Sequence, residues 1–190
     1  MLGAPPSPKT RILGTGHYAP ARVASNFDLE KIVDTSDAWI TERTGIKRRH
    51  YAADGEVTSD MAAAAGRAAL EAAGLSVADL DMIIVGTVTP DTPSPSCAVQ
   101  VQQKLGADEI PAFDLSAACA GFIYGVTIAD QFIRTGNARC ILVIGVEKLS
   151  DFVRKDDLDL FRRELDVVLL FECENKVQVL KRVPSVDRVG

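Results

Sequence analysis

Apolar positions along the first 150 residues alternate between short continuous runs and longer stretches with helical spacing. Strands are predicted at residues 10–14, 82–87, 112–115 and 140–145, with a short extended piece at 45–50. Helices are predicted at residues 26–34, 36–43, 60–73, 95–105 and 119–134. Continuous apolar strands that alternate with helices are typical of a parallel sheet covered on both faces, so the pattern predicts an α/β fold.

Capping residues support several of these boundaries. Ser36 and Ser59 each precede a predicted helix, and Ser94 precedes Pro95 in the arrangement of an N-cap with proline at the first helical position. Glycines follow the last predicted turn of three helices: Gly74, Gly106 and Gly136.

The predicted helix at residues 119–134 is apolar around nearly its whole circumference rather than along one stripe. A helix of this kind is normally buried on all sides. We therefore expect it to form a middle layer, with a second sheet or another subunit covering the side that faces away from the predicted sheet.

Composition narrows the class of protein. The 190 residues are 47% hydrophobic and 25% charged, as in a globular chain, and the formal net charge is -5. Because no run of basic residues exceeds the three at 47–49, a nucleic-acid surface is not expected. No apolar run approaches the roughly 20 residues that a membrane span requires, so a cytoplasmic protein is expected.

The character of the chain changes near residue 150. The last 40 residues contain no alanine and 17 charged residues, unlike the alanine-rich segment before them. We therefore predict a domain over residues 1–150 and a divergent charged tail over 151–190, which is either an appendage or the result of a truncation. Within the tail, residues 167–171 and 177–183 are predicted to pair as a hairpin.

Four cysteines are widely spaced, and His17 and His50 are the only histidines, which is poor spacing for a zinc site. No metal is therefore expected, and the cysteines are interpreted as reduced thiols. Cys119 has a special position because it lies between a predicted strand and the apolar helix. The amide groups at a helix N-terminus favour a thiolate and can hold an oxyanion, so Cys119 is the candidate nucleophile, whereas packing explains the other three.

A glycine pattern and the two histidines each allow a functional and a structural interpretation. The segment from Gly14 to Ala19 has the G-x-G-x-x-A outline of a dinucleotide-binding turn, but Pro20 stands where the helix should open, which favours a simple tight turn. His17 is interpreted as a turn residue and His50 as a solvated one.

Thr35, Trp39 and Arg43 are spaced four residues apart, so they can share one face of a short helix or its entrance. A half-buried tryptophan beside a snorkelling arginine is one interpretation. The other is the entrance of a binding site, where an adenine stacks on the indole and a phosphate pairs with the guanidinium.

Three ordered segments together resemble the β-ketoacyl-acyl-carrier-protein synthase III family of the thiolase superfamily. They are residues 35–46 (TSDAWITERTGI), 92–97 (TPSPSC) and 112–122 (AFDLSAACAGF). The resemblance covers roughly residues 9–150. It implies a thiolase-like αβαβα layered sandwich of two similar halves, of which this chain supplies the N-terminal one, and a homodimer.

The resemblance also implies a reaction and its site. The thiol matching Cys119 takes an acyl group from acyl-CoA and then condenses with malonyl-acyl carrier protein, in fatty acid biosynthesis and without a cofactor. The positions matching Thr35, Trp39 and Arg43 lie at the CoA entrance. Ser94 matches a position where the family often has a bulkier residue that lines the acyl pocket of the partner subunit, and its small size is expected to leave room for a longer or branched starter.

The chain departs from the family pattern in two respects, of which one is that the glycine-rich strand usually found after the fourth strand is replaced by the charged tail. The family uses a histidine and an asparagine from its second half, and neither His17 nor His50 matches that histidine, so acylation without turnover is expected. The alternatives are a starter acyltransferase of secondary metabolism, a noncatalytic half that binds CoA or carrier protein, and a truncated reading frame without function.

Overall fold

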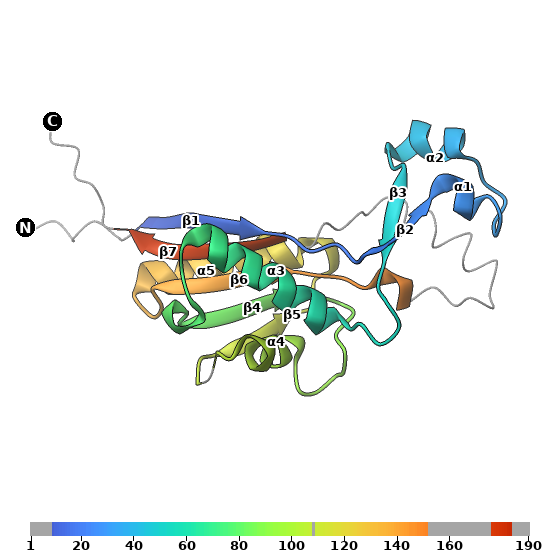
Figure 1. The fold of residues 1–190 in the computed structure, drawn as a ribbon. Coiled ribbons are helices and arrows are strands. Elements are labelled where there is room, and N and C mark those ends of the chain that lie inside the picture. The colour runs from blue at the N-terminus through green and yellow to red at the C-terminus, as the bar shows by residue number, and fades with distance from the viewer. Residues whose placement is uncertain (1–8, 108, 152–175, 184–190) are drawn as a thin grey trace, which may run out of the picture.

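The computed structural model describes residues 9–107, 109–151 and 176–183 (Figure 1). The strands are β1 (Lys9–Gly16), β2 (Arg22–Ser25), β3 (Arg48–Tyr51), β4 (Met82–Gly86), β5 (Ala112–Leu115), β6 (Cys140–Gly145) and β7 (Lys176–Val183). The helices are α1 (Asn26–Leu29), α2 (Asp37–Thr44), α3 (Thr58–Ala73), α4 (Cys97–Leu105) and α5 (Gly121–Thr135). Short 3-10 turns are η1 (Val77–Asp79), η2 (Ala118–Ala120) and η3 (Leu149–Asp151).

The main sheet has five strands in the order β1-β7-β6-β4-β5. β4 is parallel to both β5 and β6, whereas β7 is antiparallel to both β1 and β6. The predicted α/β class is therefore confirmed, and the four strands predicted for the parallel sheet run in the same direction; the sheet is mixed because β7, which was not expected in it, runs in the opposite direction. Its reversal makes β1 parallel to β6.

β7 comes from the predicted tail and is an inner strand of the main sheet, between β1 and β6. Both of its edges are occupied, so the expected hairpin with residues 167–171 is wrong for this strand; those residues lie outside the described part of the chain. The division into domains at residue 150 stays a prediction.

Side chains of the sheet alternate between two cores. Ile83, Val85 and Leu142 belong to the core that contains α3 and α4 residues, whereas Ile84 and Val143 belong to the core formed with α5. Figure 1 shows α3 in front of the sheet and α5 behind it. This arrangement confirms the expected coverage of both sheet faces and explains why β4 and β6 are apolar at every position.

Gly14 and Gly16 belong to β1 and not to a turn, so the tight-turn interpretation is wrong. A Cβ on Gly14 would lie 2.4 Å from the carbonyl oxygen of Ala69, and one on Gly16 would lie 2.4 Å from that of Ala65. The two glycines therefore allow the alanine-rich helix α3 to lie directly on the β1 backbone.

The starts of two helices differ from those predicted from serine positions. α3 begins at Thr58 after Val57, and the Ser59 hydroxyl binds Asp91 and does not cap the helix. α4 begins at Cys97 with Ser96 as its N-cap, so the assignment of Ser94 as the cap is wrong. The N-terminus of α4 is capped by Ser96 and also by a residue distant in sequence. The carboxylate of Asp114 accepts hydrogen bonds from the first two amides of the helix.

Within the described residues α5 is buried along one face only, so the expected cover over its other face, by a second sheet or another subunit, stays a prediction. Its buried residues are small except at the C-terminal end: Gly121, Gly125, Ala129 and Ile133. Ile123 and Tyr124 are 61% and 55% exposed on the opposite face. Nothing among the described residues covers these two side chains.

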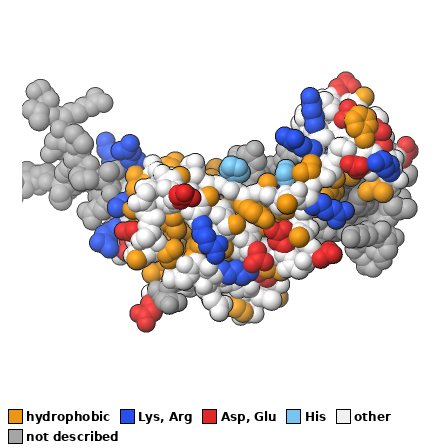
Figure 2. All heavy atoms as spheres, in the orientation of Figure 1, with side chains coloured by type: hydrophobic (Ala, Val, Ile, Leu, Met, Phe, Trp, Pro, Cys, Tyr) orange, Lys and Arg blue, Asp and Glu red, His pale blue; other side chains and the backbone are white. Residues whose placement is uncertain are grey.

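A small subdomain projects from the main sheet, formed by the β2–β3 hairpin with α1 and α2 (Figure 1). Its apolar core is Leu29, Ile40 and Ile46. On the face shown in Figure 2, charged side chains of both signs are interspersed over this projection. Within the described ranges, no helix has both the length and the apolar character needed to cross a membrane.

The start of α5 lies against the end of β4 because both positions are glycine. A Cβ on Gly86 would lie 2.8 Å from the carbonyl carbon of Gly121 and 3.0 Å from the amide nitrogen of Phe122. A Cβ on Gly121 would lie 3.2 Å from the Cα of Gly86. The segment that leads into α5 is thus held at the carboxyl end of the sheet by backbone contact.

Replacing Gly86 with alanine should therefore destabilise the fold. The added methyl group meets backbone atoms that cannot rotate away, so we expect Gly86→Ala to lower the free energy of unfolding by about 3 kcal/mol, near the upper end for overpacking. Urea denaturation monitored by circular dichroism measures the change.

Gly66→Ala is the matched control for this substitution. Its Cβ would meet the Leu142 side chain at 3.3 Å, and this flexible group can move. Alanine also favours a helix interior by about 0.5–1 kcal/mol over glycine, so Gly66→Ala should be neutral or stabilising. Equal destabilisation by the two variants would contradict the role given to the Gly86 contact.

Candidate functional site

Cys119 lies in the short turn η2, between β5 and α5, and not in the first turn of the helix as the sequence suggested. Its side chain is exposed. Ala118, directly before it, has φ = 44°, in the left-handed region that a residue with a Cβ rarely adopts. Strain of this kind costs about 1–3 kcal/mol and is concentrated at functional sites. The backbone conformation next to Cys119 therefore agrees with its choice as the candidate nucleophile.

The other described cysteines have different surroundings. Cys97 and Cys140 are buried. Burial raises the pKa of Cys140 to about 11, and burial together with the nearby carboxylate of Asp114 raises the pKa of Cys97 still further. Both thiols are therefore protonated near neutral pH, which agrees with their interpretation as packing residues; Cys173 lies outside the described residues.

Trp39 and Arg43 lie together on α2. The Arg43 guanidinium carbon is 4.8 Å from the centre of the indole ring, so the two form a cation–π pair, and Trp39 is 38% exposed. Thr35 precedes the Ser36 cap of α2, and its hydroxyl oxygen is buried without a hydrogen-bond partner among the described residues. The structure thus brings Trp39 and Arg43 together, whereas the hydroxyl of Thr35 is buried away from the surface.

Asn26 holds this subdomain together and was missed by the sequence analysis. Its amide donates to the Asp37 carboxylate at 2.8 Å and to the Ile46 carbonyl at 2.8 Å, and its carbonyl oxygen accepts from Arg49 at 2.8 Å. These bonds connect the start of α1 to α2 and β3. Asn26 is completely buried, so it fixes the position of α2 and of the Trp39 side chain that α2 carries.

Ser94 is exposed in the segment of residues 87–96, which connects β4 to α4 and is called the 87–96 loop below. The far end of this loop is fixed by Asp114. The two carboxylate oxygens of Asp114 accept from the amides of Cys97 and Ala98, each at 2.7 Å. Asp114 belongs to β5, so the loop and the segment before Cys119 are connected through one strand.

Glu147 follows β6 and binds the near end of the 87–96 loop. Its carboxylate accepts from the amide of Val88 at 3.0 and 3.2 Å, from the Thr87 hydroxyl at 3.2 Å and from the Thr89 hydroxyl at 2.8 Å. Burial raises the pKa of Glu147, although the hydrogen bonds from Thr89, Val88 and Thr87 act in the opposite direction. No sequence motif distinguishes this glutamate from a surface residue.

Both histidines are exposed. The ring Nδ1 of His50 lies 2.6 Å from the carbonyl oxygen of Pro20, which ties β3 to the start of the hairpin. In the described residues, no three His, Cys, Asp or Glu side chains are grouped as a metal site would require.

The candidate residues are reached from one edge of the main sheet. The strand registers align Gly86, Leu115 and Gly145, which end β4, β5 and β6, and place Gly16, which ends β1, one position before them, level with Ile144. From β1, β4, β5 and β6 the chain leaves this edge toward the Trp39 subdomain, the 87–96 loop, Cys119 and Glu147 respectively. The carboxyl ends of strands in an open α/β sheet are where ligands commonly bind.

Comparisons with known proteins agree with this arrangement. A family model described as 3-oxoacyl-[acyl-carrier-protein (ACP)] synthase III matches residues 113–165. The β-ketoacyl-[acyl-carrier-protein] synthase III of Thiobacillus denitrificans is 59% identical over 142 residues, which are 74% of this chain and 44% of that protein.

Two solved structures are also similar to this chain. The crystal structure of 3-oxoacyl-[acyl-carrier-protein] synthase III from Aquifex aeolicus superimposes with a TM-score of 0.82 at 49% identity, over 92% of this chain and 54% of that one. The priming β-ketosynthase of the R1128 polyketide biosynthetic pathway gives a TM-score of 0.84 at 36% identity, over 96% of this chain and 52% of that one.

The layered fold and the site at its strand ends define a thiolase-like protein. The part of the chain that these comparisons match belongs to the β-ketoacyl-acyl-carrier-protein synthase III family. The chain spans about half the length of the relatives that it matches.

The raised pKa of Glu147 predicts how stability depends on pH. Between its ordinary pKa of 4.5 and the raised value, the folded chain binds this proton more tightly than the unfolded chain does. The contribution of Glu147 to folding is therefore greatest below pH 4.5 and decreases as the pH rises through the raised pKa. In urea denaturation series from about pH 4 to about pH 8, the stability of the wild type relative to Glu147→Gln should fall with rising pH. A constant difference would contradict the prediction.

Proposed function

We propose that this chain carries the acyl-accepting part of a β-ketoacyl-acyl-carrier-protein synthase III, with Cys119 as the residue that takes an acyl group from acyl-CoA. The observation that carries the proposal is the convergence of Cys119, the 87–96 loop and the chain leading to Trp39 on one edge of the main sheet. Similarity to enzymes named for this activity supports the same function.

The proposed chemistry needs a thiolate and a place for negative charge. The Cys119 sulfur attacks the thioester carbonyl, the tetrahedral intermediate collapses, and the CoA thiolate leaves, so that one thioester is exchanged for another. Exposure of the Cys119 side chain gives the substrate access, and the amides at the start of α5 are suited to hold the oxyanion. Small residues around Cys119, such as Ala117, Ala120 and Gly121, allow a close approach of the carbonyl to the backbone.

The CoA part of the substrate is proposed to bind at α2. The exposed indole of Trp39 offers a surface for adenine, and Arg43, already held 4.8 Å from that ring, offers a cation for a phosphate. Thr35, whose buried hydroxyl has no hydrogen-bond partner among the described residues, precedes the cap of α2 and is proposed to belong to the same CoA entrance. Ser94 is proposed to border the acyl pocket of the partner subunit in a homodimer.

The complete reaction includes a second stage, in which malonyl-acyl carrier protein condenses with the acyl-cysteine. Carrier protein as a partner, a homodimer, a cytoplasmic location and the lack of a resident cofactor belong to this proposal. It also stays a prediction that this chain lacks the histidine and asparagine that the family uses. The isolated chain is therefore expected to be acylated once and not to turn over.

A starter-selecting enzyme of secondary metabolism is the second candidate. The 36% identity to the R1128 priming β-ketosynthase over nearly the whole chain favours it. The two candidates use the same cysteine and differ in the acyl group and its acceptor, so competition between acetyl-CoA and longer acyl-CoAs, followed by transfer to carrier proteins of each type, distinguishes them.

Incubation with acetyl-CoA should add one acetyl group to the wild type and none to Cys119→Ala. We expect the rate of adduct formation to fall by at least about 10³-fold, as for removal of other catalytic nucleophiles. Intact-mass spectrometry measures the adduct. Cys140→Ala is the control, because that thiol is buried and its pKa is raised to about 11, so this variant should still be acetylated. An adduct that persists in Cys119→Ala would overturn the assignment of the nucleophile.

Trp39→Ala should weaken the binding of CoA by about 5- to 150-fold, which corresponds to loss of a base–aromatic stack of about 1–3 kcal/mol. Phe27→Ala is the matched control, because Phe27 is a 60% exposed aromatic residue on α1 of the same subdomain. Isothermal titration calorimetry gives both dissociation constants. If the two variants bind CoA equally well, Trp39 is not part of the binding site.

A further inference from the structure

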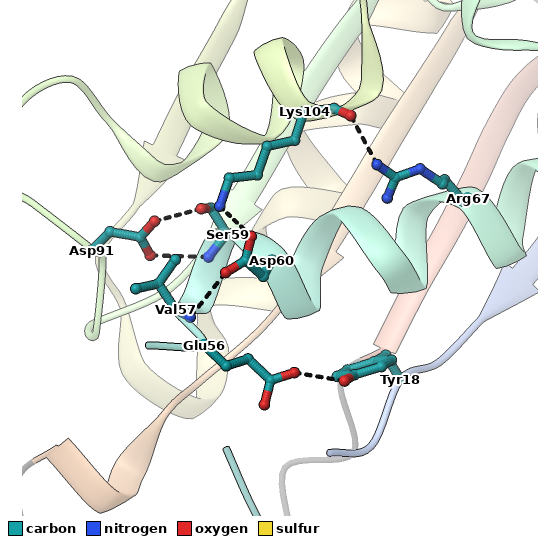
Figure 3. A network of polar contacts seen from close by, with 8 residues as sticks. All are labelled: Tyr18, Glu56, Val57, Ser59, Asp60, Arg67, Asp91 and Lys104. Atoms are coloured by element: carbon teal, nitrogen blue, oxygen red, sulfur yellow. Dashed lines mark hydrogen bonds and ion pairs between the residues drawn. The ribbon is translucent and has the colours of Figure 1, made fainter. Parts of the chain in front are cut away.

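The subdomain that carries Trp39 is attached to the main sheet by two chain segments, one between β1 and β2 and the other between β3 and α3. The Tyr18 hydroxyl in the first segment donates to the Glu56 carboxylate in the second (Figure 3). The amide of Val57, which follows Glu56, donates to Asp60 in the first turn of α3. The base of the subdomain is therefore fixed to α3, and the position of Trp39 is decided within the subdomain.

Apolar packing holds α2 at one point. The helix has eight residues, and a helix of this length is not stable alone in water. Ile40 is its only buried residue. A helix held by one side chain can still turn about that point, and the neighbouring Trp39 would move with it. The orientation of the indole therefore depends on the polar contacts of α2.

Asn26 supplies a buried polar contact to the first turn of α2. Its side-chain amide group donates to the Asp37 carboxylate at 2.8 Å. Glu30 also binds this turn, because its carboxylate accepts from the Asp37 amide at 2.7 Å, but Glu30 is exposed, so water competes for that bond. Asn26 is completely buried, and water does not compete at its end of the contact.

The remaining bonds of Asn26 give its side chain one orientation. The group that donates to Asp37 also donates to the Ile46 carbonyl, and the side-chain oxygen accepts from the buried Arg49. Both the donor and the acceptor end of the amide thus have partners within the subdomain, and neither aspartate nor leucine, which are similar in size, could supply the two donations. The contact therefore fixes α2 relative to α1 and β3.

We infer that Asn26 is a positioning residue for the nucleotide of acyl-CoA, because it holds α2 so that Trp39 and Arg43 can engage the adenine and a phosphate together. This inference rests on the proposed function. Asn26 is buried and does not touch the substrate. Cys119 is positioned separately, by backbone contacts at the start of α5. Loss of Asn26 should therefore weaken recognition of the nucleotide and leave the reactivity of Cys119 unchanged.

The test compares two acyl donors on the full chain. Acetyl-CoA carries the nucleotide, whereas S-acetylpantetheine carries the same thioester and arm without the phosphates and the adenosine. The readout is the ratio of the second-order rate constants with which the two donors acylate Cys119, followed by intact mass. A change in the reactivity of Cys119, or a general loss of folded protein, alters both rate constants equally and leaves their ratio as it was.

Asn26→Ala should lower this ratio by about tenfold, within the range of about 5- to 150-fold for loss of a base–aromatic stack. At saturating acetyl-CoA its acylation rate should equal that of the wild type, because only binding of the nucleotide is impaired. Ser25→Ala is the matched control. The Ser25 hydroxyl caps α1 by accepting from the Asp28 amide, so this variant weakens the same subdomain without changing a contact to α2, and it should keep the wild-type ratio.

A double variant tests whether Asn26 acts through the indole. In the Trp39→Ala background the stack is already lost, so adding Asn26→Ala should lower the ratio by about twofold at most. If Asn26→Ala has its full effect in this background, it does not act through Trp39, and the inference is overturned.

Substitutions of Asp37 decide the result if Asn26→Ala does not fold. Asp37→Ala and Asp37→Asn both remove the negative charge, but only asparagine keeps an oxygen that can accept from Asn26. Asp37→Ala should therefore give a ratio about fivefold below that of Asp37→Asn, the effect of one net hydrogen bond. Equal ratios for the two variants would contradict the role of this contact.

Each outcome decides one question. If the wild type takes no acetyl group on Cys119 from either donor, the proposed function fails and the role of Asn26 fails with it. If the two donors acylate the wild type equally well, the proposed CoA site at α2 fails, again with the role of Asn26. If the wild type prefers acetyl-CoA and Asn26→Ala keeps this preference, only the inference about Asn26 is overturned.

Discussion

The arrangement of the candidate site depends on the contact between two glycines, Gly86 at the end of β4 and Gly121 at the start of α5. Because neither has a side chain, the helix backbone lies directly against the strand backbone. The connection from β5 to α5 must then turn within a few residues, and Ala118 adopts a positive φ in that turn. Cys119 is consequently presented at the sheet edge by rigid elements on both sides, as a nucleophile requires.

The two parts of the candidate site are built by different interactions. Around Cys119 the determining contacts are between backbones, and glycines at the strand ends make them possible. Around Trp39 the determining contacts are polar, because the buried Asn26 joins α1, α2 and β3 in a subdomain with only a small apolar core. The first part is stiff because atoms are in close contact, whereas the second relies on hydrogen bonds that all have to be satisfied.

Elements with strong local signals could be predicted from the sequence. The strands at 112–115 and 140–145 have the predicted bounds, and Cys119 was found because it stands between a strand and a helix. Features that depend on distant residues could not be predicted: Asp114 as a cap of α4, Asn26 as a hub and Glu147 as a loop contact have no local pattern. Gly14 and Gly16 were misinterpreted for the same reason, since the helix that requires them lies about 50 residues further along the chain.

The outer face of α5 shows how packing against the sheet determined the rest of this helix. Only small residues fit where the helix meets the sheet near its start; a Cβ on Gly125, for example, would lie 2.9 Å from a methyl group of Val143. The large apolar residues Ile123 and Tyr124 therefore face away from the sheet, where they are 61% and 55% exposed and part of their possible burial energy is not realised. The apolar residues on all sides of this helix thus have two origins: small residues allow a close approach of the backbone on one side, and large apolar residues form an exposed surface on the other. Hydrophobic periodicity alone does not distinguish the two.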